Sequence, residues 1–370
     1  MCLTVSFLLT ACSNGHSINK SVSTQGQSGN SGSWPNGISP TFIDQKLAQW
    51  STAKAWPFLL SPTFIEASYD NIDKTNITDQ VLNEDLSMLF QTEAKAITVD
   101  IGFDPWLSSN SAEISKVTHF VNMIKQTGHV LVLKDGSAEY YRHHKLPWTQ
   151  FENAWVNRVK TIASIFKPAY YTVIKEPPWY APMIAGLSKD TNSAADQQVL
   201  DANNWILLLD RLIAAVKEVS PNTRVGVSVD ANVYDNSTGD KFDLAFLQKA
   251  VTVPGLSFIG FDIYTANAFT DTQKFLNSVN INNKAVWINE AWSITSSGFA
   301  NPDQESLDPK WAQMLLEFGR VIHAQGVSPF YTNYFASYEN LPTSANLLLQ
   351  YFKGRTPVFY AFQNYEKSSG

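Results

Sequence analysis

The chain has 370 residues, of which 44% are hydrophobic and 13% aromatic, and this composition can build a large apolar core. Its formal net charge of −6 and its pI near 5.5 argue against a nucleic-acid-binding surface, which would need a basic patch. The two cysteines, Cys2 and Cys12, both lie near the N-terminus, so the rest of the chain has no cysteine for a disulfide, thiol catalysis or a zinc site.

The first residues, MCLTVSFLLTAC, form an apolar run of about the length of a secretory signal. The end of this run, Leu9-Thr10-Ala11-Cys12, resembles the lipobox of bacterial lipoproteins. The resemblance implies that residues 1–11 are removed and that Cys12 is acylated as the first mature residue. A disordered apolar N-terminus is the alternative.

Residues 12–40 are rich in Ser, Gly and Asn and show no hydrophobic periodicity, which is typical of a flexible tether. Behind a lipidated cysteine, this tether would hold a soluble domain away from a membrane. No later stretch reaches 18 uninterrupted apolar residues, so the sequence predicts no spanning helix. We therefore expect a lipid-anchored protein of the bacterial cell envelope or exterior that contacts the membrane only through Cys12.

Residues 41–370 predict one domain in which short β-rich runs alternate with segments of helical period. Eight runs have the apolar, β-branched character of buried strands: 58–65, 94–103, 128–135, 169–176, 224–231, 257–264, 285–292 and 328–335. Helical periodicity is clear over 148–166, 203–219 and 309–326, and Gly326 closes the last of these as a C-terminal glycine.

Alternation of strands and helices implies a parallel sheet, and eight such units fit a (β/α)8 TIM barrel. An open doubly wound sheet is the alternative. That fold usually carries a glycine-rich phosphate loop after its first strand, and neither G-x-G-x-x-G nor G-x-x-x-x-G-K-[ST] occurs in the chain. The sequence therefore favours the barrel.

The carboxyl ends of barrel strands carry the chemistry, so polar and aromatic residues that end or follow the predicted strands are candidates. They include Asp104, Lys134, Asp135, Glu139, Lys175, Glu176, Trp179, Asp230, Asp262, Tyr264, Asn289, Glu290 and Trp292. Glu176 and Glu290 stand out because each ends a strongly apolar strand, the fourth and the seventh. Two carboxylates facing each other about 5–5.5 Å apart are the apparatus of a retaining glycosidase.

Three segments carry a family resemblance: VIKEPPWY around Glu176, VWINEAW around Glu290, and SFIGFDIY, which ends at Tyr264. They resemble the clan of retaining (β/α)8 glycoside hydrolases whose catalytic glutamates end strands 4 and 7. The resemblance implies that Glu176 is the general acid/base, that Glu290 is the nucleophile and that Tyr264 orients the nucleophile.

The chain departs from the clan at Lys175, because the clan usually has an asparagine immediately before the strand-4 glutamate. Lys175 is expected either to bind the carboxylate of an acidic sugar or to turn away into a salt bridge. Further candidate substrate-binding residues are Trp179 and Trp292 for stacking on sugar rings, Asp104, Glu139 and Asp230 for sugar hydroxyls, and Asn289 beside the second glutamate.

The sequence predicts neither a metal site nor an organic cofactor. The adjacent His143 and His144 cannot both face one ion from a strand or a helix, and no other ligand spacing accompanies them. We expect a monomeric glycoside hydrolase that acts on a β-linked oligo- or polysaccharide. A catalytically inactive carbohydrate-binding lipoprotein on the same barrel remains the alternative.

Overall fold

The protein is represented by a computed structural model, which describes residues 38–51, 56–64, 86–87, 89–101, 111–135, 147–177, 198–234, 238–291, 309–329, 349–350, 354–355 and 357–369. The expected signal and most of the expected tether lie outside these residues. So do the candidates Cys12, Asp104, Glu139, Trp179 and Trp292.

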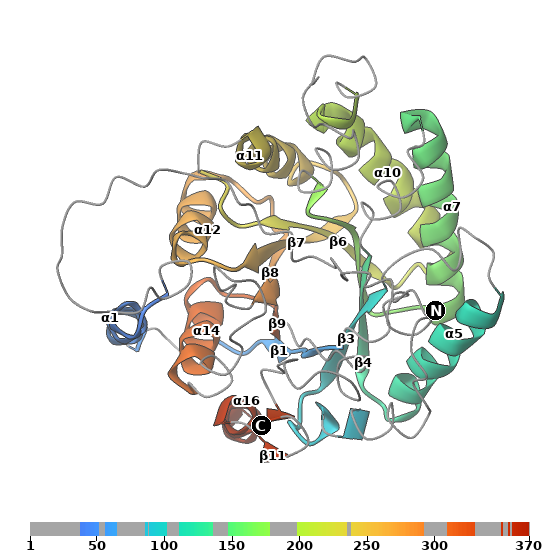
Figure 1. The fold of residues 1–370 in the computed structure, drawn as a ribbon. Helices are drawn as coiled ribbons and strands as arrows, with labels where there is room; N and C mark the ends of the chain where they lie inside the picture. The colour runs from blue at the N-terminus through green and yellow to red at the C-terminus, as the bar shows by residue number, and fades with distance from the viewer. Residues whose placement is uncertain are drawn as a thin grey trace, which may run out of the picture.

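The described strands form one parallel sheet that closes into a barrel, with its strands around a common centre in Figure 1. The sheet order is β1 (Leu59–Leu60), β9 (Gly326–Pro329), β8 (Ala285–Ala291), β7 (Leu256–Ile263), β6 (Arg224–Asp230), β5 (Tyr170–Lys175), β4 (Val130–Asp135), β3 (Ala96–Ile101) and β2 (Thr63–Phe64). Only Ser61 and Pro62 separate β1 from β2, so these two strands are one interrupted strand whose halves pair with β9 and β3. The fold is therefore the expected eight-stranded TIM barrel.

Helices surround the barrel in Figure 1. They are α1 (Pro40–Trp50), α5 (Ser111–Gln126), α7 (Trp148–Phe166), α10 (Ala202–Val219), α11 (Thr238–Ala250), α12 (Ala266–Ser278), α14 (Pro309–Val321) and α16 (Pro357–Ser369), and β10 (Leu349–Gln350) pairs with β11 (Gly354–Arg355) as a small antiparallel ribbon. Within the described residues, no helix combines the length and the apolar character needed to cross a membrane.

Helix α10 shows why these segments are helical. Asp201 caps its N-terminus by accepting a hydrogen bond from the backbone N–H of Asn203. Its apolar residues recur at the helical spacing and are buried: Trp205, Leu208, Leu209, Leu212, Ile213 and Val216. Helix α7 packs beside it, with Trp148 and Trp205 edge to face at 5.1 Å. Both helices were predicted within one residue of their observed bounds.

The prediction for the last clear helix was wrong at its C-terminal end. Helix α14 stops at Val321, a turn with His323 at φ 52° follows, and Gly326 begins strand β9. Gly326 does not cap a helix. It leaves room for an aromatic ring, because a Cβ there would lie 2.3 Å from the Trp287 indole. The sequence pattern could not show this contact, since Trp287 is distant in the chain.

Apolar side chains fill the amino-terminal part of the barrel interior, and we call this cluster the plug. Trp287, Phe258 and Tyr170 lie together, with ring centroids 4.8 to 5.4 Å from the indole of Trp287. Gly226 accommodates the Phe258 ring, since a Cβ there would lie 2.1 Å from it. This plug occupies the barrel interior toward the amino-terminal ends of the strands, and the buried polar side chains of the interior lie toward the carboxyl ends.

Candidate active site

Glu176 and Glu290 meet at the carboxyl-terminal mouth of the barrel, and a tyrosine joins them. The Tyr264 hydroxyl lies 2.6 Å from Glu176 Oε1 and 2.8 Å from Glu290 Oε1. The three residues follow or end β5, β7 and β8, and all of them are at least 90% buried. The fold therefore brings together the two glutamates and the tyrosine that sequence analysis selected.

Glu290 reaches the interior because strand β8 does not alternate regularly. Trp287 and Asn289 both face inward, so strict alternation would turn Glu290 outward. The pairing of β7 with β8 shifts register, so that Phe261 faces Ile288 while the next residue, Asp262, faces Glu290. Such a shift, typical of a β-bulge, lets two consecutive side chains point into the barrel.

Strand β5 has a comparable irregularity. Its register against β6 shifts between Thr172 and Ile174, which reverses the alternation and turns Lys175 inward. The next residue, Glu176, has φ 43°, a left-handed conformation that is uncommon outside glycine. Together these features place Lys175 and Glu176 in the same site, although neighbouring residues of a regular strand point to opposite faces.

Two buried lysines hold the other side of Glu290. Lys175 Nζ lies 2.7 Å from Glu290 Oε2 and 3.1 Å from Asp100 Oδ2. Lys134 Nζ lies 3.3 Å from the same Glu290 oxygen and also donates to the Asn289 carbonyl oxygen at 3.2 Å. Lys175 thus forms a salt bridge, but the expectation that it turns away from the site was wrong, because the side chain points inward and pairs with Glu290.

Burial and these contacts shift the pKa values of the two glutamates in opposite directions. Burial by itself would raise the pKa of Glu290, but Lys175 and Lys134 overcome this effect and lower it to about 2. Burial raises the pKa of Glu176; Lys175 opposes the rise, and the negative charge of Glu290 adds to it. The mouth thus carries one carboxyl group whose pKa is raised and one whose pKa is lowered, so the surroundings push the two pKa values apart.

A polar layer lies beneath the glutamates. Asn289 donates from Nδ2 to Ser228 Oγ at 3.0 Å and to Asp262 Oδ1 at 3.2 Å, and its Oδ1 accepts from Thr172 Oγ1 at 2.9 Å. Ser228 Oγ donates to Asp262 Oδ2 at 3.0 Å. These four buried residues link strands β5, β6, β7 and β8. Asn289, a candidate substrate-binding residue, thus lies inside the barrel. Its side-chain amide hydrogen-bonds the other residues of this layer.

Asp230, expected to bind sugar hydroxyls, accepts through Oδ1 from the backbone N–H and the Nδ2 of Asn232 at 3.0 and 2.7 Å. These bonds shape the turn after β6.

Sequence analysis listed Lys134 and Asp262 among the strand-end candidates but assigned them no role, and it missed Asp100. The available signal was their position, since each is a charged residue in an otherwise apolar strand. Asp135 carries the same signal and lies elsewhere: it faces helix α7, where Arg158 Nη2 donates to it at 2.8 Å. Only the inward or outward direction of each side chain separates these cases.

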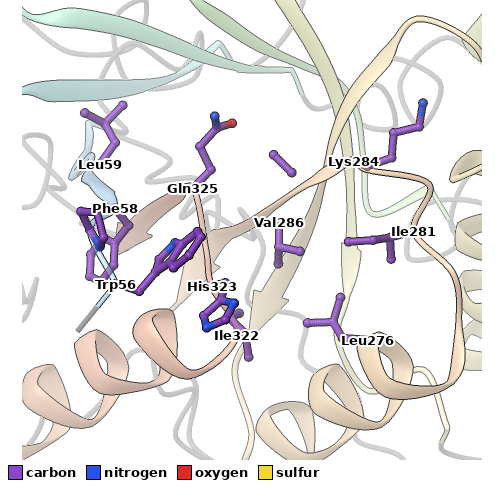
Figure 2. Close-up of a pocket in the computed structure, with 12 residues that line it drawn as sticks. Trp56, Phe58, Leu59, Leu276, Ile281, Lys284, Val286, Ile322, His323 and Gln325 are labelled. Carbon is purple, nitrogen blue, oxygen red and sulfur yellow. The ribbon is translucent and has the colours of Figure 1, made fainter. Parts of the chain in front are cut away.

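A cavity of about 680 Å³ lies at the opposite end of the barrel (Figure 2). Residues that precede or begin β1, β8 and β9 line it, including Trp56, Val286 and Gln325. The Trp56 indole stacks on the His323 ring at a centroid distance of 4.2 Å. This cavity contains neither glutamate. No group of three or more His, Cys, Asp or Glu side chains suited to a metal ion occurs among the residues described.

No family model and no curated protein matches the sequence. The fold, by contrast, is similar to solved structures of carbohydrate-active barrels at 10 to 11% sequence identity. Xylanase 10B from Thermotoga maritima is 10% identical, with a TM-score of 0.53 over 88% of this chain and 97% of that one. A β-glucosidase from Thermotoga maritima is 10% identical, with a TM-score of 0.56 over 86% and 99%. A fungal β-1,4-galactanase is 11% identical, with a TM-score of 0.55 over 84% of this chain and 99% of that one. At this identity the similarity shows the fold alone, which is a TIM barrel.

Proposed function

We propose that this protein is a glycoside hydrolase that cleaves β-linked oligo- or polysaccharides by a retaining, double-displacement mechanism. The proposal rests on one observation: Glu176 and Glu290 each accept a hydrogen bond from the same hydroxyl, that of Tyr264. The two oxygens that Tyr264 contacts lie no farther apart than the sum of the two hydrogen bonds, about 5.4 Å, which suits the ~5–5.5 Å separation used by retaining enzymes.

The electrostatics support a division of roles. Glu176, whose pKa burial raises, protonates the oxygen of the leaving group. Glu290, whose pKa is about 2, attacks the anomeric carbon as a carboxylate and forms a glycosyl-enzyme. Water then hydrolyses this intermediate, and Glu176 takes the proton of that water. The xylanase, β-glucosidase and galactanase that share the fold support the same class of substrate.

The test is an activity screen on β-glucan, mannan, galactan, xylan and acidic glycans, followed by variants on any substrate that is cleaved. Glu290→Gln and Glu176→Gln should each lower turnover by several orders of magnitude, whereas the exposed Glu218→Gln should retain it. Product anomers followed by NMR should keep the β configuration. Wild-type turnover in either glutamate variant, or an inverted first product, would contradict the assignment.

A non-catalytic carbohydrate-binding protein is the second candidate, and the two lysines on Glu290 favour it. An ammonium 2.7 Å from a carboxylate oxygen stabilises the charge that a nucleophile has to donate. Calorimetric binding of an oligosaccharide that the purified protein never hydrolyses would support this candidate. Hydrolysis that disappears in Glu290→Gln would eliminate it.

We also propose that the protein is anchored to a membrane by a lipid on Cys12, with residues 12–40 as the tether. The four-residue lipobox resemblance at the end of an apolar run supports this location. Mass spectrometry of the N-terminal peptide from the membrane fraction should find an acylated Cys12. Cys12→Ser should release the protein into the soluble fraction.

A further inference from the structure

Strand β5 contains one residue more than its pairing with β6 requires. Thr172 and Ile174 pair with Gly226 and Val227, which are consecutive residues of β6. Val173 is therefore the extra residue of a β-bulge. On the other side of β5, the pairing with β4 reaches only Thr172. Within the described sheet, Val173 thus has no paired residue in either neighbouring strand.

A side chain of helix α7 contacts the backbone of this extra residue. Trp155 Nε1 donates a hydrogen bond to the Val173 carbonyl oxygen at 3.1 Å. Neither residue has exposed surface, so water does not replace this bond. A buried carbonyl oxygen without a donor is costly, and the extra residue of a bulge is left out of the regular ladder. The indole N–H therefore supplies a donor at the residue that lacks a pairing partner.

The bulge determines the direction of Lys175. Val173 and Ile174 both belong to the apolar cluster that the strands share with the helices, and not to the plug, so two consecutive side chains face outward. Lys175 then points inward and reaches Glu290 Oε2 at 2.7 Å. In a strand that alternated regularly from the inward-facing Thr172, Lys175 would face the helices instead. The ion pair with Glu290 therefore depends on the bulge.

The same side of helix α7 also contacts strands β3 and β4. Arg158 lies three residues after Trp155 and so on the same face of the helix. Its Nη2 donates to the Ile101 carbonyl oxygen of β3 at 3.3 Å and to Asp135 Oδ1 of β4 at 2.8 Å. The residue before each of these acceptors is a charged residue of the site. Helix α7 thus fixes, from outside the barrel, three consecutive strands that carry site residues on the inside.

We propose that Trp155 is a positioning residue whose indole N–H fixes the bulge at Val173 and thereby keeps Lys175 on Glu290. Trp155 acts through the backbone of β5 and not by contact with a substrate. The consequence for catalysis rests on the proposed function. Lys175 lowers the pKa of Glu290, so the ionised state of the nucleophile depends in part on a helix outside the barrel.

The test compares Trp155→Phe with a matched control, Trp205→Phe. Trp205 on α10 is also without exposed surface, and its Nε1 donates to the Val199 carbonyl oxygen at 2.8 Å. That carbonyl oxygen lies in the chain before α10, outside the barrel sheet. Each variant removes a buried indole N–H from a backbone carbonyl oxygen, so both should lower the urea midpoint. Only Trp155→Phe should displace Lys175.

NMR of protein labelled with ¹⁵N at lysine measures this displacement at pH 7 and needs no substrate. The Lys175 ammonium signal is identified by its absence in Lys175→Met. In Trp155→Phe the signal should leave its wild-type position or disappear through exchange with water, whereas in Trp205→Phe it should stay in place. An unchanged signal in folded Trp155→Phe, or an equal displacement in both variants, would overturn the proposal. If Trp155→Phe does not fold, benzothienylalanine at position 155 keeps the ring system, removes the N–H, and is read by the same two outcomes.

Kinetics distinguish this proposal from the proposed function. If the wild type cleaves a glycan, the acidic limb of kcat/KM should move to higher pH in Trp155→Phe, because Glu290 loses part of its cationic stabilisation. The limb should not move in Trp205→Phe. An acidic limb that stays in place in Trp155→Phe would contradict the positioning role. If the wild type cleaves no glycan, the proposed function fails, and the NMR comparison still decides the role of Trp155.

Discussion

Replacing Lys175 by methionine tests the electrostatic account of the mouth. The change removes the ammonium that lies 2.7 Å from Glu290 Oε2 and 3.1 Å from Asp100 Oδ2, and it leaves an apolar side chain of similar length. Glu290 retains Lys134 and Tyr264 as neighbours. The substitution therefore weakens the stabilisation of a buried carboxylate while preserving most of the packing.

The magnitude follows from the pKa of Glu290. A fall from 4.5 to about 2 favours the ionised form by about 3 kcal/mol in the folded state, and removing one member of a buried ion pair typically costs ~3–5 kcal/mol. We therefore expect Lys175→Met to lower the free energy of unfolding by about 3 kcal/mol at pH 7. Urea denaturation followed by circular dichroism measures this quantity.

The loss should depend on pH in a defined direction. Because the folded-state pKa of Glu290 is depressed, its contribution to stability is complete above the unfolded value of 4.5 and disappears as the pH falls toward 2. The difference between wild type and Lys175→Met should thus shrink as the pH is lowered from 6 toward 3.

The matched control is Lys160→Met. Lys160 Nζ lies 2.6 Å from Glu218 Oε1, a similar distance, but the two side chains are 39% and 64% exposed, so the expected cost is within ~1 kcal/mol. Equal losses in the two lysine variants, or a Lys175→Met loss that does not change with pH, would refute the reasoning.

Three further variants test the site and the interior. Tyr264→Phe removes the hydroxyl shared by the two glutamates and should lower turnover at least tenfold on any substrate the wild type cleaves. Circular dichroism should show that the variant is folded, and wild-type turnover would contradict the role of the hydroxyl. Thr172→Val leaves the buried Asn289 Oδ1 without the hydroxyl donor of Thr172 and should lower the free energy of unfolding, measured by urea denaturation, by ~1–3 kcal/mol. An unchanged urea midpoint would show that this hydrogen bond contributes little to stability. Gly226→Ala places a methyl group 2.1 Å from the Phe258 ring and should lower the free energy of unfolding by ~1–3 kcal/mol or more. A variant with wild-type stability and an unchanged near-UV circular dichroism spectrum would contradict the packing of the plug.

Much of the fold was predictable because it depends on local signals. Eight apolar, β-branched runs alternate with helical segments, and each described strand of the barrel overlaps its predicted range. The short strands β10 and β11 were not predicted. The first strand was predicted as one run over 58–65, whereas the structure divides it into β1 and β2. Gly326 was misassigned because a helix cap and a close ring contact both call for glycine, and sequence spacing does not separate them.

The candidate site was predictable in part. Residues at strand ends in a barrel gather at one mouth whatever the details of packing, and this rule located Glu176, Tyr264 and Glu290. The partners of these residues were not predictable in the same way. Lys175 and Asp262 contact residues of other strands, and those contacts depend on the direction in which each side chain points.

By itself the sequence determined the TIM barrel and the acidic strand ends, since hydrophobic period and strand-terminal polarity are properties of consecutive residues. The tertiary structure alone decided which of those residues meet. Register shifts in β5 and β8 reverse the inward and outward faces, and they bring Lys175 and Glu290 to the same interior. Register is a relation between two strands, and no single strand encodes it. For that reason the lysine that departs from the clan's pattern beside Glu176 in the sequence is, in the folded protein, an ion-pair partner of Glu290.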